Sequence, residues 1–437
     1  MSKIISILLI CVVLFGMISC TTDNESITTS GLEQTSSPQD QTTEGGETSE
    51  GDSSTTQSPI VESPFGIDLS DLSEMMLPIF SGNTVKNETV MFLDKGETKT
   101  LLFPIENVIS VTSYDGTIVY QEGVDYSVVD GKLKVLEKSS IPCITTAKYY
   151  NCPGSKLHTN YRGEEVATYW GEDLMDDWQI NVSYTHTESW KGFEQDCQAD
   201  IFENFINKLQ NGEDVTVIFF GDSITNGSNA SWRGNYAPYQ HPYPMLFVEA
   251  LADLFDYTVH YERVDNKLSG TPKVPDKDYV AGTRGTITYV NTAVGGLDTK
   301  EGADRAEASV SLFAKLYGCD LLVLAFGMND GTNAPSFTSD NLKTIVDGAL
   351  KIAPETSVAL ITTMVSNPAD TRRSATAKAN QRSAVKELAN NYVNDGVPCG
   401  VAGMGSVSLS VLERKAFHDY SGNNINHPHD FFGRVYA

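Results

Sequence analysis

The distribution of hydrophobic and polar residues changes character along the chain. After an apolar start, Thr21 to about Ser63 consists mainly of Ser, Thr, Glu, Gln and Gly. From Pro64 to about Gly192, short apolar or alternating runs are separated by Gly and Asp-Gly pairs, which is typical of strands joined by tight turns. From Phe193 onward, short apolar runs alternate with segments in which apolar residues recur at helical spacing. The pattern therefore predicts a β region followed by an α/β region.

The second region predicts an open parallel sheet. The expected strands are Val215–Phe220, Thr286–Val294, Asp320–Phe326, Ser357–Met364 and Pro398–Ala402. The expected helices are Tyr243–Phe255, Lys300–Tyr317, Ser339–Ile352 and Ala375–Tyr392. This alternation indicates right-handed βαβ units with helices on both faces of the sheet. The stretch "YTVHYERV" near Tyr257 is an extra strand or hairpin that the pattern does not place.

The first region predicts an all-β sandwich, of jelly-roll-like architecture. Its stretches "DGTIVY" and "DGKLKVL" have the form of hairpin turns followed by strands. The chain is thus expected to divide into residues 1–20, a tether over 21–63, a β-sandwich domain over 64–192 and an α/β domain over 193–437.

The N-terminus predicts export. "MSKIISILLICVVLFGMISC" joins a lysine to an apolar run of signal-peptide length and ends in small Ser19 before Cys20. This resembles a bacterial lipobox, which implies lipidation at Cys20; a plain secretory signal is the alternative. The following segment contains no Lys or Arg between Lys3 and Lys86 and has too few apolar residues to form a core. We expect a flexible tether that holds the folded part at a cell surface or on the periplasmic side of a membrane.

The net charge limits the classes of binding partner, and the cysteines bear on disulfide formation and metal binding. A formal net charge of −26 argues against nucleic acid and anionic lipid, and it is compatible with a neutral or cationic substrate. Contact with a membrane is expected only through the lipid anchor, and the folded part is expected to be a monomer. Cys143 and Cys152 are close enough in sequence to form a disulfide outside the cell. No Cys/His spacing indicates zinc, and no metal or cofactor is expected.

Chemically distinctive residues follow the predicted strands. In open α/β sheets, ligands bind beyond the carboxyl ends of the strands. There the chain carries "GDSITNG", "NTAVGGLDT" and "FGMNDGT" in order, and "NHPHDFFGRVYA" near its end. Each block alone is explained by turn or capping chemistry. In this order, over roughly Asp214 to Ala437, the blocks resemble the SGNH, or GDSL, hydrolases. The resemblance implies a flavodoxin-like three-layer α/β domain.

The resemblance also implies catalytic roles. Ser223 is the expected nucleophile and His427 the expected general base, because a serine needs an adjacent base to become nucleophilic. Three donors would stabilise the oxyanion: the backbone N–H of Ser223, the backbone N–H of Gly296 and the side-chain amide of Asn329. Gly295 is the alternative backbone donor, one position earlier.

The histidine block departs from the family pattern. Many relatives have an aspartate three residues before the histidine, where this chain has Asn424. Asn424 is a possible orienting group, and the resemblance to some carbohydrate esterases implies a Ser–His dyad oriented by a main-chain carbonyl. Asp419 and Asp430 are weaker candidates. His429 is the nearest alternative base, but only His427 falls on the family's His-Pro pair.

A β domain before an SGNH domain resembles two-domain bacterial carbohydrate esterases. The expected function is therefore removal of O-acetyl groups from carbohydrate. Trp232 could offer an aromatic face to a sugar ring, or it could pack in the core. The alternatives are an SGNH-type O-acetyltransferase, a lipase or thioesterase, and a non-catalytic polysaccharide-binding protein.

Overall fold

The computed structural model describes residues 72, 76, 79–151, 156–159, 165–168, 175–264, 271–368, 370 and 373–437. The expected signal peptide, Cys20, the tether over 21–63 and Cys152 lie outside these residues. Export, lipidation and the pairing of Cys143 with Cys152 therefore stay predictions. Within the described ranges, no helix is long and apolar enough to span a bilayer.

The α/β region is built on a seven-stranded sheet in the order β11-β10-β12-β9-β13-β14-β15. Its strands are β9 (Val215–Gly221), β10 (Tyr257–Tyr261), β11 (Tyr279–Val280), β12 (Gly285–Asn291), β13 (Leu321–Ala325), β14 (Ser357–Ile361) and β15 (Cys399–Ala402). All neighbours pair in parallel except β10 and β11. The predicted open parallel sheet is confirmed. The unplaced stretch near Tyr257 proves to be β10, which lies beside β12.

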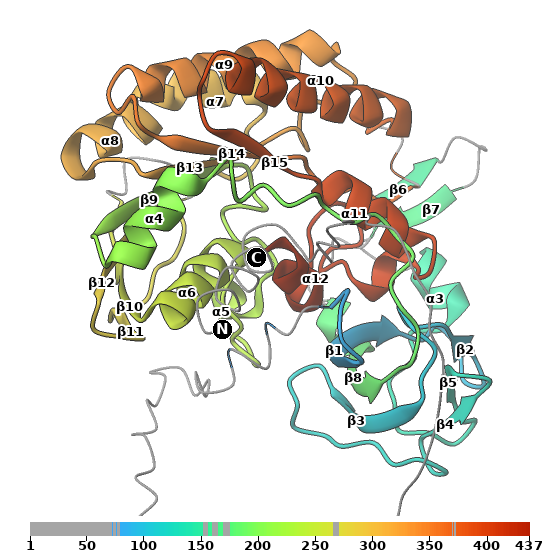
Figure 1. The fold of residues 1–437 in the computed structure, drawn as a ribbon. Helices are drawn as coiled ribbons and strands as arrows, with labels where there is room; N and C mark the ends of the chain where they lie inside the picture. Colours follow the sequence, from blue (N-terminus) through green and yellow to red (C-terminus); the bar gives the residue numbers. More distant parts are fainter. Residues whose placement is uncertain are drawn as a thin grey trace, which may run out of the picture.

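Alternate residues of the buried strands face two different helical layers. Val215, Val217 and Phe219 of β9 belong to one apolar cluster, and Ile218 and Phe220 belong to the other. The first cluster includes side chains of α4 (Glu203–Asn211), α6 (Tyr243–Phe255), α11 (Met404–Leu412) and α12 (Asp430–Tyr436). The second includes side chains of α7 (Thr299–Ala306), α8 (Leu312–Tyr317), α9 (Pro335–Leu350) and α10 (Ala375–Asn394). Figure 1 shows the resulting three layers, with α7 to α10 above the sheet and α4 and α6 below it.

The β region contains small sheets. One has the order β1 (Thr84–Met91), β8 (Gln179–Thr185), β3 (Asn107–Ser113), and another the order β2 (Thr98–Lys99), β5 (Lys132–Val135), β4 (Tyr126–Val129). A two-stranded pair joins β6 (Lys156–Thr159) to β7 (Glu165–Thr168), and the short helix α3 (Thr146–Asn151) precedes it. The predicted hairpin at "DGKLKVL" is β4–β5, whose turn residues Asp130 and Gly131 both have positive φ, 50° and 71°.

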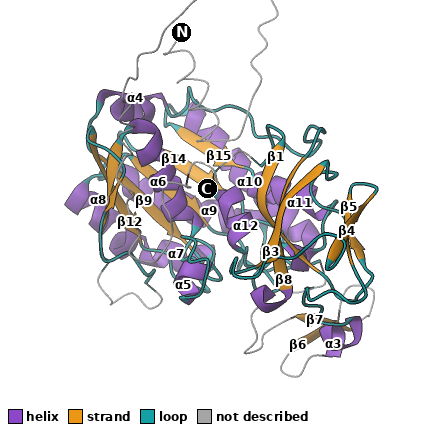
Figure 2. Cartoon of the chain, turned by 90° about the horizontal axis from the view of Figure 1, so that it is seen from below, coloured by secondary structure: helices purple, strands orange, loops and turns teal. Residues whose placement is uncertain are grey.

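The β region and the α/β region share one apolar core. A single cluster of buried side chains contains Val90, Phe92 and Tyr184 from the β region together with Phe417 and Phe431 from the end of the chain. Both views place β1 and β8 next to α12 (Figures 1 and 2). The β region therefore packs directly against the α/β region and shares its hydrophobic core.

Candidate active site

The first block forms a tight turn at the end of the central strand β9. Every residue of β9 is buried, and the turn brings Ser223 to the carboxyl edge of the sheet with 7% of its surface exposed. A Cβ on Gly221 would lie 2.5 Å from the carbonyl oxygen of Ala325 on β13, so this position requires glycine. The carboxylate of Asp222 accepts the N–H of Ile224 at 2.9 Å and thereby closes the turn.

A closed loop carries the histidine. Oδ1 of Asn423 accepts the N–H groups of Ile425, Asn426 and His427 at 2.9, 3.0 and 3.1 Å. The carbonyl of His427 in turn accepts the hydroxyl of Ser421 at 2.9 Å. These bonds are local, so the short segment fixes its own shape and presents the ring of His427.

The loop brings His427 onto Ser223. Nε2 of His427 lies 2.8 Å from Oγ of Ser223, although the two residues are 204 positions apart. On the other side of the ring, Nδ1 lies 2.7 Å from Oδ1 of Asn229. Sequence reasoning missed Asn229. Its only signal was its place two residues after "GDSITNG", on the same turn as the serine.

The orienting groups expected from the sequence are wrong. Asn424 is buried, donates to the hydroxyl of Tyr149 at 2.6 Å and accepts from Asn367 at 3.2 Å. Asp419 accepts the N–H of Met91 at 3.0 Å. The expected main-chain carbonyl is likewise replaced at Nδ1 by a side-chain amide. The side chain of Asn424, whose φ is 54°, is thus bonded to Tyr149 of the β region.

Asp430 and His429 do not orient His427 either, because both contact Tyr114 of the β region. Asp430 accepts the hydroxyl of Tyr114 at 2.5 Å and the N–H of Ser231 at 3.0 Å. The ring of His429 is 2% exposed and stacks on Tyr114 with centroids 4.1 Å apart. Burial lowers the pKa of His429 to about 3. His429 therefore packs against the β region and does not face the serine.

The expected oxyanion donors lie on the loops after the strands that flank β9. Gly295 and Gly296 follow β12 and are exposed; a Cβ on Gly295 would be 3.8 Å from Cβ of Ser223. Gly296 has φ +86°, a conformation that favours glycine. Asn329 follows β13, and its Nδ2 donates to the carbonyl of Leu297 at 3.0 Å. An amide nitrogen carries two hydrogens, so this bond orients Asn329 while leaving a second N–H for an oxyanion.

Burial sets the charge state of the site. Burial, together with the smaller effect of the nearby guanidinium of Arg373, lowers the pKa of His427 to about 4. The imidazole is therefore neutral over a wide pH range, which is the form that can accept a proton. Arg373 also donates from Nε to the carbonyl of Met328 at 3.1 Å and contacts Oδ1 of Asn329 at 3.5 Å.

Trp232 does not offer its ring to a ligand. It is 1% exposed, packs edge-on against His241 at 5.0 Å and lies under the ammonium group of Lys273. Of the two roles considered from the sequence, the structure assigns it to core packing. The expectation that Trp232 binds sugar is therefore wrong.

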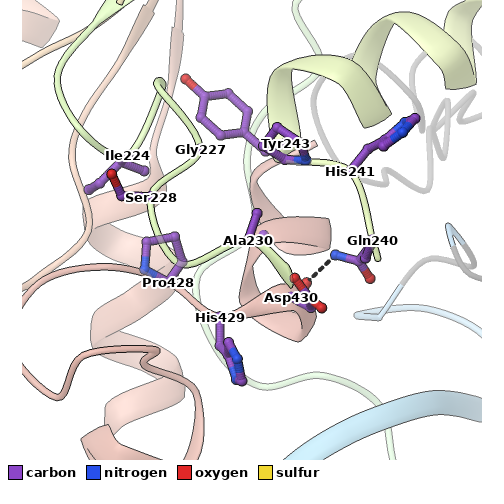
Figure 3. A pocket seen from close by; sticks show the side chains of 12 residues that line it. Ile224, Gly227, Ser228, Ala230, Gln240, His241, Tyr243, Pro428, His429 and Asp430 are labelled. Atoms are coloured by element: carbon purple, nitrogen blue, oxygen red, sulfur yellow. Dashed lines mark hydrogen bonds between the residues drawn. The ribbon is translucent and has the colours of Figure 1, made fainter. Parts of the chain in front are cut away.

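A small cavity backs the serine turn. Its volume is about 20 Å³, enough for one water, and it is lined by residues of the segments 224–230, 240–243 and 428–433. Figure 3 shows the ring of His429 pointing away from Ser228 and Pro428, and Gln240 bonded to the main chain of Asp430. The cavity is too small for a sugar or an acyl group, so it belongs to the packing behind the site.

The β region holds the segment that carries the histidine. Lys415 forms a fully buried ion pair with Glu88 of β1. Gln179 of β8 donates to the carbonyls of His418 and Ser421 at 2.7 and 3.0 Å. Together with the Tyr114–Asp430 bond, these contacts fix residues on both sides of His427 to the β region.

Comparison with known proteins agrees with the geometry. Residues 219–400 match the model of the GDSL-like Lipase/Acylhydrolase family, a range that includes Ser223 and Asn329 and ends before His427. No curated protein matches the chain.

Solved structures similar to this chain include a two-domain esterase active on acetylated mannans, crystallised with mannopentaose (17% identity, 55% of this chain and 50% of that one, TM-score 0.38). A second is a lipase/acylhydrolase from Enterococcus faecalis (18% identity, 51% of this chain and 90% of that one, TM-score 0.34). A third is a member of the lipolytic G-D-S-L family from Veillonella parvula (14% identity, 51% of this chain and 93% of that one, TM-score 0.32). The chain spans half the length of the first of these. Likeness at this level says nothing about substrate.

Proposed function

We propose that this protein is a serine esterase that removes O-acetyl groups from carbohydrate, and the match of residues 219–400 to the GDSL-like Lipase/Acylhydrolase family model supports the proposal. The observation that carries the proposal is the 2.8 Å contact between Oγ of Ser223 and Nε2 of His427. It pairs a weak nucleophile with a neutral base within hydrogen-bond distance.

The reaction follows from this pair. The hydroxyl proton of Ser223 passes to Nε2 of His427 while Oγ bonds to the acyl carbon of the ester. The carbonyl oxygen becomes an oxyanion, which the N–H of Ser223, the N–H of Gly296 and the amide of Asn329 stabilise. When the intermediate collapses, the bond to the sugar oxygen breaks and Nε2 returns the proton to that oxygen. Water then repeats the sequence on the acyl-enzyme, releasing acetic acid and restoring Ser223.

The surroundings of Ser223 support a hydroxylated substrate with a small acyl group. The exposed residues nearby on the β12 loop are glycines, and the neighbouring side chains are the half-buried amide of Asn329 and the half-buried guanidinium of Arg373. Such groups can hydrogen-bond to a sugar. The net charge of −26 also fits a neutral polysaccharide better than an anionic one.

The same proposal places the enzyme outside the cell. A signal peptide cleaved before Cys20, lipidation of Cys20 and an acidic tether would hold the catalytic domain at a membrane surface, as a monomer, with access to polymeric substrate. Acylated carbohydrate is the partner that this arrangement serves.

The test is release of acetate from a panel of acetylated glycans, with Ser223→Ala as the control. We expect acetate from at least one glycan and none above background with the variant, which should keep the wild-type melting temperature. Preference for long acyl chains would indicate a lipase or thioesterase. Faster transfer to an acceptor sugar than hydrolysis would indicate a transferase. Full activity of Ser223→Ala would end the proposal.

A further inference from the structure

The side chain of Asn229 is bonded at both ends. Its Oδ1 lies 2.7 Å from Nδ1 of His427, and its Nδ2 donates to the carbonyl of Gly422 at 3.1 Å. A carboxamide has one acceptor end and one donor end. Because the donor end is on Gly422, the acceptor end faces the ring, and Nδ1 of His427 must carry the hydrogen.

The backbone on each side is shaped for this contact. Asn229 has φ 67°, a left-handed conformation that Asn adopts more readily than most residues. It lies on the serine turn, where the N–H of Ser228 bonds to the carbonyl of Ser223 at 2.9 Å. A Cβ on Gly422 would lie 2.5 Å from Cβ of Asn229, so only glycine allows this approach. One amide thus ties the nucleophile's turn to the histidine's loop.

We propose that Asn229 is the positioning residue of the active site and makes it a Ser–His–Asn triad with an uncharged third member. This inference rests on the proposed function and goes beyond it. Asn229 fixes the imidazole in the tautomer whose Nε2 lone pair faces Ser223, and it holds the plane of the ring. Asn229 takes the place of the aspartate that many relatives have three residues before the histidine, where this chain has Asn424. It comes from the segment just after "GDSITNG" and not from the segment that carries His427.

An uncharged third member has a consequence for pH dependence. An amide accepts the Nδ1 hydrogen but adds no negative charge, so it does not favour the imidazolium form as a carboxylate would. Ser223 and Asn229, which are both neutral, face the imidazole ring of His427. Among the described residues, the charged group that affects the pKa of this ring is the guanidinium of Arg373. Arg373 is itself bonded to Asp370 at 2.5 Å. The site is therefore arranged to keep the base unprotonated in mildly acidic solution.

Two substitutions separate positioning from simple packing. Asn229→Gly removes the amide and keeps a residue suited to φ 67°. It should lower kcat by roughly 10- to 100-fold, as expected for loss of a half-buried hydrogen bond to the catalytic base, with little change in KM. Asn229→Asp keeps the shape and adds a carboxylate, which should move the acid limb of the kcat/KM profile upward by roughly 1–3 pH units.

The matched control is Asn235, which is exposed, has φ 61° and lies six residues further on. Asn235→Gly and Asn235→Asp should leave kcat and the pH profile unchanged. The measurements use full-length protein, hydrolysis of a small acetyl ester between pH 3.5 and 8, and circular dichroism at each pH.

The outcomes divide cleanly. A loss of kcat in Asn229→Gly together with a raised acid limb in Asn229→Asp supports the proposal. A wild-type kcat in Asn229→Gly overturns the proposal. An unchanged acid limb of the kcat/KM profile in Asn229→Asp also overturns it, because an asparagine that only supports the fold would not affect the titration of the base. If these variants behave like wild type while Ser223→Ala is inactive, only the role of Asn229 fails; if Ser223→Ala is active, the proposed function fails.

Discussion

Lys415→Met tests whether the β region holds the histidine-bearing segment. The ammonium of Lys415 and the carboxylate of Glu88 are both fully buried and paired. Glu88 also accepts the N–H of Leu102 at 2.9 Å and the hydroxyl of Tyr184 at 2.7 Å. Methionine has nearly the same length as lysine, so the substitution removes the charge and leaves most of the volume. The carboxylate of Glu88 then remains buried with two neutral donors and without its ion-pair partner.

The expected loss of stability is large. Removing one partner of a buried ion pair typically destabilises a protein by about 3–5 kcal/mol, because the other charge stays buried without compensation. That is a substantial part of a total stability of about 5–15 kcal/mol. With an m-value of about 3 kcal/mol/M, the midpoint of urea unfolding should fall by about 1–1.7 M. The double variant Glu88→Gln/Lys415→Met should recover most of the loss, because no unpaired charge remains.

The assay follows unfolding by urea with far-UV circular dichroism and measures ester hydrolysis along the same titration. Activity should disappear together with the fold, at lower urea in Lys415→Met than in wild type. The control is Lys300→Met, which breaks an exposed pair with Asp304 and should change stability by at most about 0.5 kcal/mol. A loss of under about 1 kcal/mol for Lys415→Met, in the range of a surface pair, would show that the Lys415–Glu88 pair does not hold this segment to the β region.

Further predictions concern the chemistry and the strand end. Since the pKa of His427 is lowered to about 4 and the base works in its neutral form, kcat/KM should fall only below about pH 5. At pH 5.5 about 97% of such a ring is neutral, against about 9% for an ordinary histidine. A fall in kcat/KM that begins near pH 7 would contradict this prediction. Asn329→Ala should lower kcat by roughly 10²–10³-fold at unchanged melting temperature, and a loss under threefold would exclude it from the oxyanion site. Gly221→Ala should destabilise the fold by about 1–3 kcal/mol in a melting experiment, because its Cβ meets the carbonyl of Ala325, whereas an unchanged melting temperature would show that β9 and β13 can separate there.

The strands and most helices of the α/β region were predictable because their signals are local. Short apolar runs such as Val215–Gly221 are buried on both faces, and the turn residues after them mark where each strand ends. The sequence order of the blocks also placed Ser223 and Asn329 at neighbouring strand ends. The strand order then brought those ends together.

The group that orients His427 was not predictable in the same way. Sequence spacing points to the position three residues before the histidine, where Asn424 stands. The actual contact comes from Asn229, 198 positions earlier, and depends on the left-handed backbone there and on the missing side chain of Gly422. The two roles of Trp232 could not be separated for a related reason: the sequence near a catalytic block does not show whether an aromatic ring is buried or exposed.

Covalent labelling shows whether Ser223 is a nucleophile activated by His427. Wild-type protein and His427→Ala would be treated with a fluorophosphonate, and the modified peptide would be identified by mass spectrometry. We expect one phosphonylated residue, Ser223, in the wild type, with labelling slowed at least about 10²-fold in His427→Ala. Labelling of another residue, or equal labelling rates in the two proteins, would contradict this expectation.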